Sequence, residues 1–89
     1  MTTVRLKIKG KVQGVFFRAT AKQIAEKNNL KGWIKHKSNG DVEAVVTGKK
    51  EAVETFIEWC KQGPKRAVID EVNITPIDEI IFSEFQIKR

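Results

Sequence analysis

The first residues of the chain alternate between apolar and basic side chains. Val4, Leu6 and Ile8 are each separated by one Arg or Lys. A period of two places successive side chains on opposite faces of a β-strand. The pattern therefore predicts a strand with one buried face and one solvated face, which ends at Gly10.

Helical periodicity begins after this strand. A first stripe of side chains at helical spacing comprises Phe17, Ala21, Ile24, Ala25 and Asn28. A second stripe comprises Ala52, Val53, Phe56, Ile57 and Cys60, with Trp59 beside it. Each pattern predicts an amphipathic helix, and Gly63-Pro64 is a pair that commonly ends one. We expect Trp59 and Cys60 to serve packing and not chemistry.

Two strands are predicted between the helices. One runs from Trp33 to His36, and the next covers residues 41–47, with alternate apolar side chains facing inward. Residues 37–40 separate them and end in Asn-Gly, a pair that adopts positive φ at little steric cost. The two strands should therefore form a hairpin.

The rest of the chain predicts two further strands. Residues 67–75 are rich in β-branched side chains but are interrupted by Asp70-Glu71, which is typical of a bulged or edge strand. Residues 76–78 contain a proline and predict a turn. Residues 82–87 predict a short last strand, with Phe85 and Ile87 as its core pair.

The order β-α-β-β-α-β is the split βαβ pattern of ferredoxin-like domains. We therefore expect an α+β fold in which two helices cover one face of an antiparallel sheet. The chain has 89 residues, which predicts a single domain over residues 1–89. We expect this domain to be a monomer.

Composition narrows the possible environments and partners. The chain has no apolar run of about eighteen residues and no signal-like segment, and its only cysteine, Cys60, has no partner for an internal disulfide. These features predict a cytoplasmic protein without membrane association. The net charge of +6 favours anionic partners, but the basic residues are spread along the chain and not gathered in one block.

The stretch G-K-V-Q-G-V-F-F-R, residues 10–18, joins the first strand to the first helix. Gly10 and Gly14 permit dihedral angles closed to other residues, and such loops can present backbone N–H groups to an anion. Arg18 falls in the first turn of the following helix, where the helix dipole also favours an anion. The spacing matches neither a Walker loop nor G-x-G-x-x-G, so no nucleotide is predicted. A plain strand-to-helix connection remains the alternative.

The stretch at 10–18, followed fourteen residues later by G-W-I-K-H-K-S-N-G-D-V-E, resembles the two signature segments of the acylphosphatase family. The resemblance implies hydrolysis of an acyl phosphate to a carboxylate and inorganic phosphate, without metal or cofactor. It implies that phosphate is bound by Arg18 and by the backbone of Lys11, Val12, Gln13, Gly14, Val15 and Phe16. The sequence itself has no recognisable set of metal ligands.

One position departs from the family pattern. The family holds its attacking water with an asparagine, and His36 occupies that position here. A neutral His36 ring can also hold water, so we expect Arg18 and His36 to be the catalytic pair. Asn39 is three residues further along, too far along a strand to be assumed a substitute.

Two other functions stay open at this stage. A histidine in place of the asparagine is compatible with a weakly active or inactive domain that only binds acyl phosphate or phosphate. Ferredoxin-like sheets also bind RNA, using aromatic side chains within a defined motif. No such motif occurs and the chain has no tyrosine, so a nucleic-acid partner is disfavoured.

Overall fold

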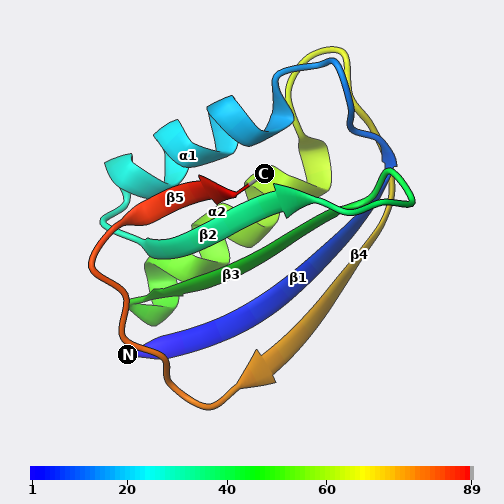
Figure 1. Cartoon of the computed structure of the whole chain (residues 1–89). Coiled ribbons are helices and arrows are strands. Elements are labelled where there is room, and N and C mark those ends of the chain that lie inside the picture. Colours follow the sequence, from blue (N-terminus) through cyan, green and yellow to red (C-terminus); the bar gives the residue numbers. More distant parts are fainter. Residues whose placement is uncertain (89) are drawn as a thin grey trace.

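The computed structural model describes residues 1–88 and shows two helices packed on one face of a five-stranded sheet (Figure 1). The helices are α1 (Phe17–Lys27) and α2 (Lys50–Gln62). The strands are β1 (Thr2–Lys11), β2 (Lys31–His36), β3 (Val42–Gly48), β4 (Val68–Ile77) and β5 (Phe85–Lys88). Their order across the sheet is β4-β1-β3-β2-β5. The ferredoxin-like β-α-β-β-α-β arrangement is confirmed, and β5 is added at one edge.

The core lies between the sheet and the helices, as the alternating pattern predicts. Leu6 and Ile8 are fully buried on β1, opposite Ala44 and Val42 of β3. Burying one such side chain contributes roughly 1.5–3 kcal/mol. The helices complete the core with their own buried residues Phe17, Ala21, Ala25, Val53, Phe56 and Cys60.

Trp59 and Cys60 take the packing roles that their positions on α2 predict. Cys60 is fully buried. The Trp59 ring packs against Phe17 of α1, with ring centroids 5.1 Å apart, and against Phe56 at 6.4 Å. Trp59 of α2 therefore joins the two helices through its contact with Phe17, the first residue of α1.

The sheet is mixed and not wholly antiparallel, which corrects the prediction. β5 runs parallel to β2, from Gly32 opposite Phe85 to Lys35 opposite Lys88. After β4, at one edge, the chain crosses the end of the sheet to the other edge, and it enters β5 at the end where β2 also starts (Figure 1). Thr3 and Thr47 hold this crossing: their hydroxyls lie 2.7 Å apart and bond the Ile80 backbone.

The prediction for residues 67–75 is confirmed, because β4 is both an edge strand and bulged. The register on β1 passes from Glu71 directly to Ile69, which leaves Asp70 as the extra residue. The predicted turn at residues 76–78 is wrong at its start, since Pro76 lies within β4 opposite Val4. Proline has no N–H, which an edge strand tolerates.

Ile87 is not the core residue that the sequence predicts. Phe85 is only 2% exposed, but Ile87 is 36% exposed.

No helix of residues 1–88 is long and apolar enough to cross a membrane. Within the same residues, no group of three or more His, Cys, Asp and Glu side chains is placed to hold a metal ion.

Candidate active site

The connection between β1 and α1, here called the 11–16 loop, has an unusual backbone. Gly14 has φ 69° and Phe16 has φ 61°, so two residues separated by a single residue adopt left-handed conformations. For a residue other than glycine this conformation costs roughly 1–2 kcal/mol, and such strain gathers at ligand-binding sites. Left-handed residues in a tight loop can turn backbone N–H groups towards one concave face, which suits an anion.

Two valines fix this loop on the protein. Val12 is 1% exposed and Val15 is 7% exposed, and both belong to the hydrophobic core. Lys11, Gln13 and Gly14 are exposed. The buried valines hold the loop backbone in place, and its other residues face solvent.

Gly10 serves the sheet and not the loop, which corrects the expectation for the two glycines. A Cβ atom at Gly10 would lie 2.0 Å from the carbonyl oxygen of Val68, at the bulged pairing with β4. A Cβ at Gly14 would meet nothing within 4 Å. Gly14 is therefore required for its positive φ, and the space beside it is open.

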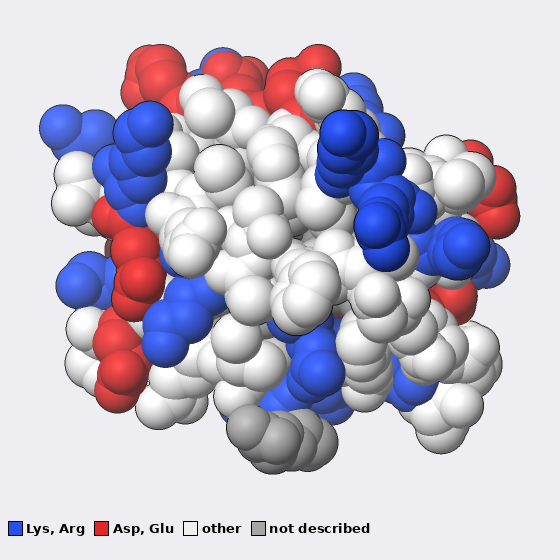
Figure 2. Space-filling model, turned by 90° about the horizontal axis from the view of Figure 1, so that it is seen from above, with Lys and Arg blue, Asp and Glu red and all other residues white. Residues whose placement is uncertain are grey.

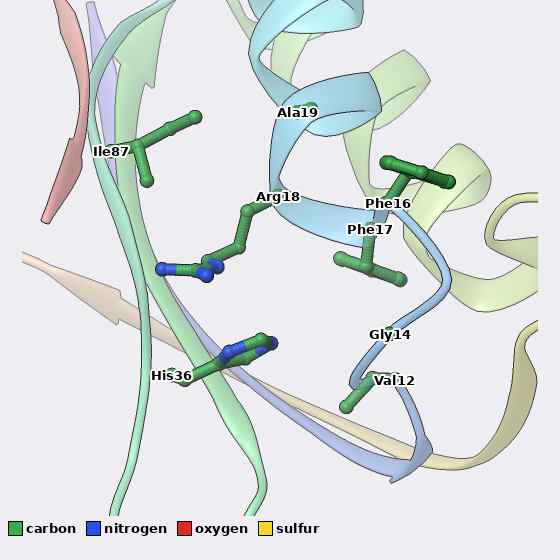
Figure 3. Close-up of a pocket in the computed structure, with 8 residues that line it drawn as sticks. All are labelled: Val12, Gly14, Phe16, Phe17, Arg18, Ala19, His36 and Ile87. Carbon is green, nitrogen blue, oxygen red and sulfur yellow. The ribbon is translucent and has the colours of Figure 1, made fainter. Parts of the chain in front are cut away.

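Arg18 lies in the first turn of α1, and its guanidinium points into a pocket towards His36 (Figure 3). Its Nη1 donates a long bond of 3.4 Å to the Lys88 carbonyl, and it makes no ion pair among the described residues. The start of α1 has no acidic residue and no side-chain cap. The positive end of this helix is thus left uncompensated, and it lies beside the guanidinium of Arg18, which has no carboxylate partner among residues 1–88.

His36 is the last residue of β2, and its ring projects into the space between Arg18 and the 11–16 loop (Figure 3). Its Nε2 is buried without a hydrogen-bond partner among residues 1–88. Loss of hydration by burial, and then the charge of Arg18, lower the pKa of His36 below its ordinary value of 6.5, while a backbone hydrogen bond with Val12 opposes them. Burial and Arg18 therefore favour the neutral form of the ring.

These groups meet in one pocket of about 330 Å³. Its lining residues are Val12, Gly14, Phe16, Phe17, Arg18, Ala19, His36 and Ile87. Five residues proposed from the sequence are thus brought together: Val12, Gly14, Phe16, Arg18 and His36.

Lys11, Gln13 and Val15 do not line this pocket, so Val12, Gly14 and Phe16 are the residues of the 11–16 loop that border it. Asn39 is also outside the pocket. Its Oδ1 accepts a hydrogen bond from the Asp41 N–H at 3.0 Å and closes the β2–β3 turn. No other asparagine takes the position of His36 in the lining.

Sequence reasoning missed Ala19 and Ile87 as lining residues. The alternating pattern of a strand predicts a core position for Ile87, because it follows Phe85 by two residues. Its position at the sheet edge, close to the start of α1, leaves it half-exposed against the pocket. The parallel pairing of β5 with β2 brings it there, and no local pattern in the sequence signals that pairing.

Comparison with known proteins places the chain in a family. A model of the acylphosphatase family matches residues 4–87. An acylphosphatase of Pyrobaculum islandicum is 50% identical over 70 residues, covering 78% of this chain and 74% of that protein. The solved acylphosphatase of Coxiella burnetii is 38% identical with TM-score 0.94, covering 98% of this chain and 92% of that one. The Bacillus subtilis acylphosphatase is 30% identical with TM-score 0.96, covering 100% of both chains. The chain therefore belongs to the acylphosphatase family.

Proposed function

We propose that this acylphosphatase hydrolyses acyl phosphates in the pocket between the 11–16 loop, Arg18 and His36. The reaction converts an acyl phosphate and water to a carboxylate and inorganic phosphate. The observation that carries the proposal is the convergence of a strained loop backbone, an uncompensated guanidinium and an unpartnered imidazole nitrogen in one pocket of about 330 Å³. A bound substrate would supply an interaction partner for each of these three groups.

The phosphoryl group is held by the loop and Arg18. Phosphoryl transfer depends mainly on positioning the substrate and on stabilising charge at the three equatorial oxygens. The loop amides and the free start of α1 present N–H donors, and the guanidinium adds a planar fork of charged donors. These donors are fixed before substrate arrives, because Val12 and Val15 fasten the loop to the core.

The leaving group needs no proton donor. A carboxylate has a conjugate-acid pKa of about 4, so it leaves as an anion at neutral pH. The pocket lining contains no Asp or Glu. This arrangement suits an acyl phosphate and does not suit an alkyl phosphate monoester, whose alkoxide leaving group requires protonation.

His36 orients the attacking water. A buried ring nitrogen without a partner is unfavourable unless something binds to it, and neutral imidazole has one nitrogen that accepts a hydrogen bond. The lowered pKa of His36, which burial and Arg18 cause, keeps the ring in this form. A water bound there would lie in the same pocket as the phosphoryl group.

The direct test is hydrolysis of a simple aryl acyl phosphate in the presence of a chelator. We expect turnover with chelator present, competitive inhibition by inorganic phosphate, and essentially no hydrolysis of an alkyl phosphate monoester. Loss of activity with chelator would contradict the metal-free mechanism. Phosphate binding without turnover would instead make the chain a binding domain.

Nucleic acid remains disfavoured as a partner. On the face of the sheet opposite the helices, Trp33 is the aromatic residue that a base would have to stack on. Its ring is already covered by the ammonium groups of Lys35, at 5.2 Å, and Lys88, at 4.7 Å. Stacking would have to displace both cations. Binding of an oligonucleotide should therefore be weak and lost as salt is raised.

We also expect the chain to act as a monomer in the cytoplasm. Cys60 is fully buried, and burial raises the pKa of its thiol, so it offers no reactive thiolate for pairing with a second copy. Sedimentation analysis would test the monomer, since a concentration-dependent increase in mass would contradict it.

A further inference from the structure

A second pocket, of about 400 Å³, adjoins the active site on the other side of Phe16. It lies between the 11–16 loop and the turn that joins α2 to β4. Gly14 and Phe16 line both pockets. The second pocket also has Thr20 of α1 and Lys65 and Arg66 of the turn in its wall.

Phe16 forms the partition between the two pockets. Its side chain is 80% exposed although it is large and apolar, and its backbone is held in the left-handed conformation. An exposed aromatic ring at a strained position is a candidate for ligand contact. Gly14 borders both pockets, and the space beside it is open, since a Cβ there would meet nothing within 4 Å.

The turn between α2 and β4 places Lys65 and Arg66 beside the pocket. The Ala67 N–H donates to the Pro64 carbonyl at 3.0 Å, with Lys65 and Arg66 between them. Gly63 enters the turn with φ 70°, and a Cβ there would meet Ala67 and Ile69 at 3.1–3.2 Å. The backbone of the turn is thus closely packed, and its position is fixed.

Lys65 and Arg66 are exposed, and no carboxylate of residues 1–88 forms an ion pair with either. Figure 2 shows Lys and Arg side chains on the right of the molecule, the side on which the two loops lie in Figure 1, and also on its left. An uncompensated pair of cations beside an open pocket raises the local concentration of anions. The chemistry of this second pocket is therefore suited to a negatively charged group.

We propose that the second pocket receives the acyl part of the substrate and that Lys65 and Arg66 favour acyl phosphates whose acyl group carries a second anionic group. This inference rests on the proposed function, since the phosphoryl end must occupy the first pocket. The acyl chain would pass Gly14 and pack on the Phe16 ring. Its far end, a carboxylate or phosphate, would then meet the two cations of the turn.

The test compares two substrates of equal shape that differ by one charge. Para-carboxybenzoyl phosphate carries a second anion, and para-carbamoylbenzoyl phosphate carries a neutral amide in its place. The measured quantity is the ratio of their kcat/KM values. Because the intrinsic reactivity of each anhydride is the same with every variant, changes in this ratio report binding of the charged group.

The double variant Lys65→Gln/Arg66→Gln should lower the ratio by about fivefold, the size expected of one or two solvent-exposed ion pairs. The matched control is Lys49→Gln/Lys50→Gln, which removes the same charge at the other end of α2, about 20 Å away. We expect this control to keep the parental ratio. Raising the salt concentration should move the parental ratio towards that of the first variant.

Equal effects of the two double variants would overturn the inference, because they would reduce it to net charge alone. A parental ratio that does not respond to salt would also overturn it. If the parent hydrolysed neither compound, the proposed function itself would fail. Hydrolysis of both without any effect of Lys65→Gln/Arg66→Gln would contradict only the role of the second pocket.

Discussion

His36 is the residue at which this chain departs from the acylphosphatase pattern, and it is also its only histidine. It lies at the end of β2 and points into the pocket (Figure 3), which supports the water-orienting role proposed for it. An imidazolium has two donors and no acceptor, so only the neutral ring can take a hydrogen bond from water. The protonation of one side chain should therefore control the reaction at low pH.

We predict that activity falls on acidification with a midpoint below pH 6.5, because burial and Arg18 lower the pKa of His36. The sole imidazole can be followed without ambiguity in an NMR titration. Its midpoint in the free enzyme should match that of the kcat/KM profile. Bound phosphate should raise this pKa, since an anion stabilises the imidazolium.

Substitutions at His36 separate a role in catalysis from a bystander position. His36→Asn should remove the acid limb and keep a rate at least equal to the parent, because the amide can hold water at every pH. His36→Ala should lose activity. If His36→Ala kept both the parental rate and its pH profile, water would have to be held by another group, such as a backbone carbonyl.

The 11–16 loop shows how two glycines in one motif serve different elements. Gly10 belongs to the sheet, where a side chain would collide with the Val68 backbone, and Gly14 belongs to the 11–16 loop, where only its positive φ is required. Spacing in the sequence does not distinguish these roles. The close approach of β4 to Gly10 comes from a pairing between residues far apart in the chain.

We predict opposite profiles for Gly10→Ala and Gly14→Ala. Gly14→Ala should cost only about 1–2 kcal/mol of stability, the strain of a left-handed non-glycine residue, but should weaken competitive inhibition by phosphate. Gly10→Ala should cost more stability, because backbone must move. Chemical denaturation and phosphate inhibition of both variants test this. A larger loss of stability with Gly14→Ala would contradict the assignment.

For the whole molecule, the lowered pKa of His36 links folding to pH. The folded state binds the proton less readily than the unfolded chain, so protonation favours unfolding. The contribution of His36 to stability is complete above its unfolded pKa of about 6.5 and is lost as pH falls through the lower folded pKa. We predict that His36→Asn flattens the pH dependence of the unfolding free energy in this window. An unchanged slope in chemical denaturation would contradict it.

Much of this architecture could be predicted from the sequence. The alternation at Val4, Leu6 and Ile8 and the two helical stripes locate most of the core, because local periodicity reflects burial directly. The parallel pairing of β5 and the continuation of β4 through Pro76 could not be predicted. The first depends on the crossing held by Thr3 and Thr47, and the second depends on the pairing of Pro76 with Val4 of β1. Both are contacts between distant parts of the chain.

The candidate site, like the fold, could be predicted from the sequence only in part. Arg18 and Gly14 lie in one contiguous motif, and His36 was located by family resemblance. Ile87 entered the pocket only through the topology of the sheet. The second pocket depends on Lys65 and Arg66 lying beside Phe16, which no spacing in the sequence indicates.

In the proposed active site, Arg18 and the 11–16 loop hold the transferred phosphoryl group. Among residues 1–88, the side chain of Arg18 makes only the 3.4 Å bond to the Lys88 carbonyl, so Arg18→Ala should leave the fold intact by circular dichroism. Arg18→Lys should recover little activity, because lysine keeps the charge but lacks the planar fork. The control is Arg5→Ala, which removes the same charge from an ion pair with Glu43 away from the pocket.

The most direct measurement is kcat/KM for an aryl acyl phosphate in Arg18→Ala and Arg5→Ala, with chelator present. We predict a loss of about 100-fold or more for Arg18→Ala, the usual effect of removing one preorganised charge-stabilising donor. Arg5→Ala should stay close to the parent. A near-parental rate for a folded Arg18→Ala, or an equal loss in both variants, would contradict the proposed active site.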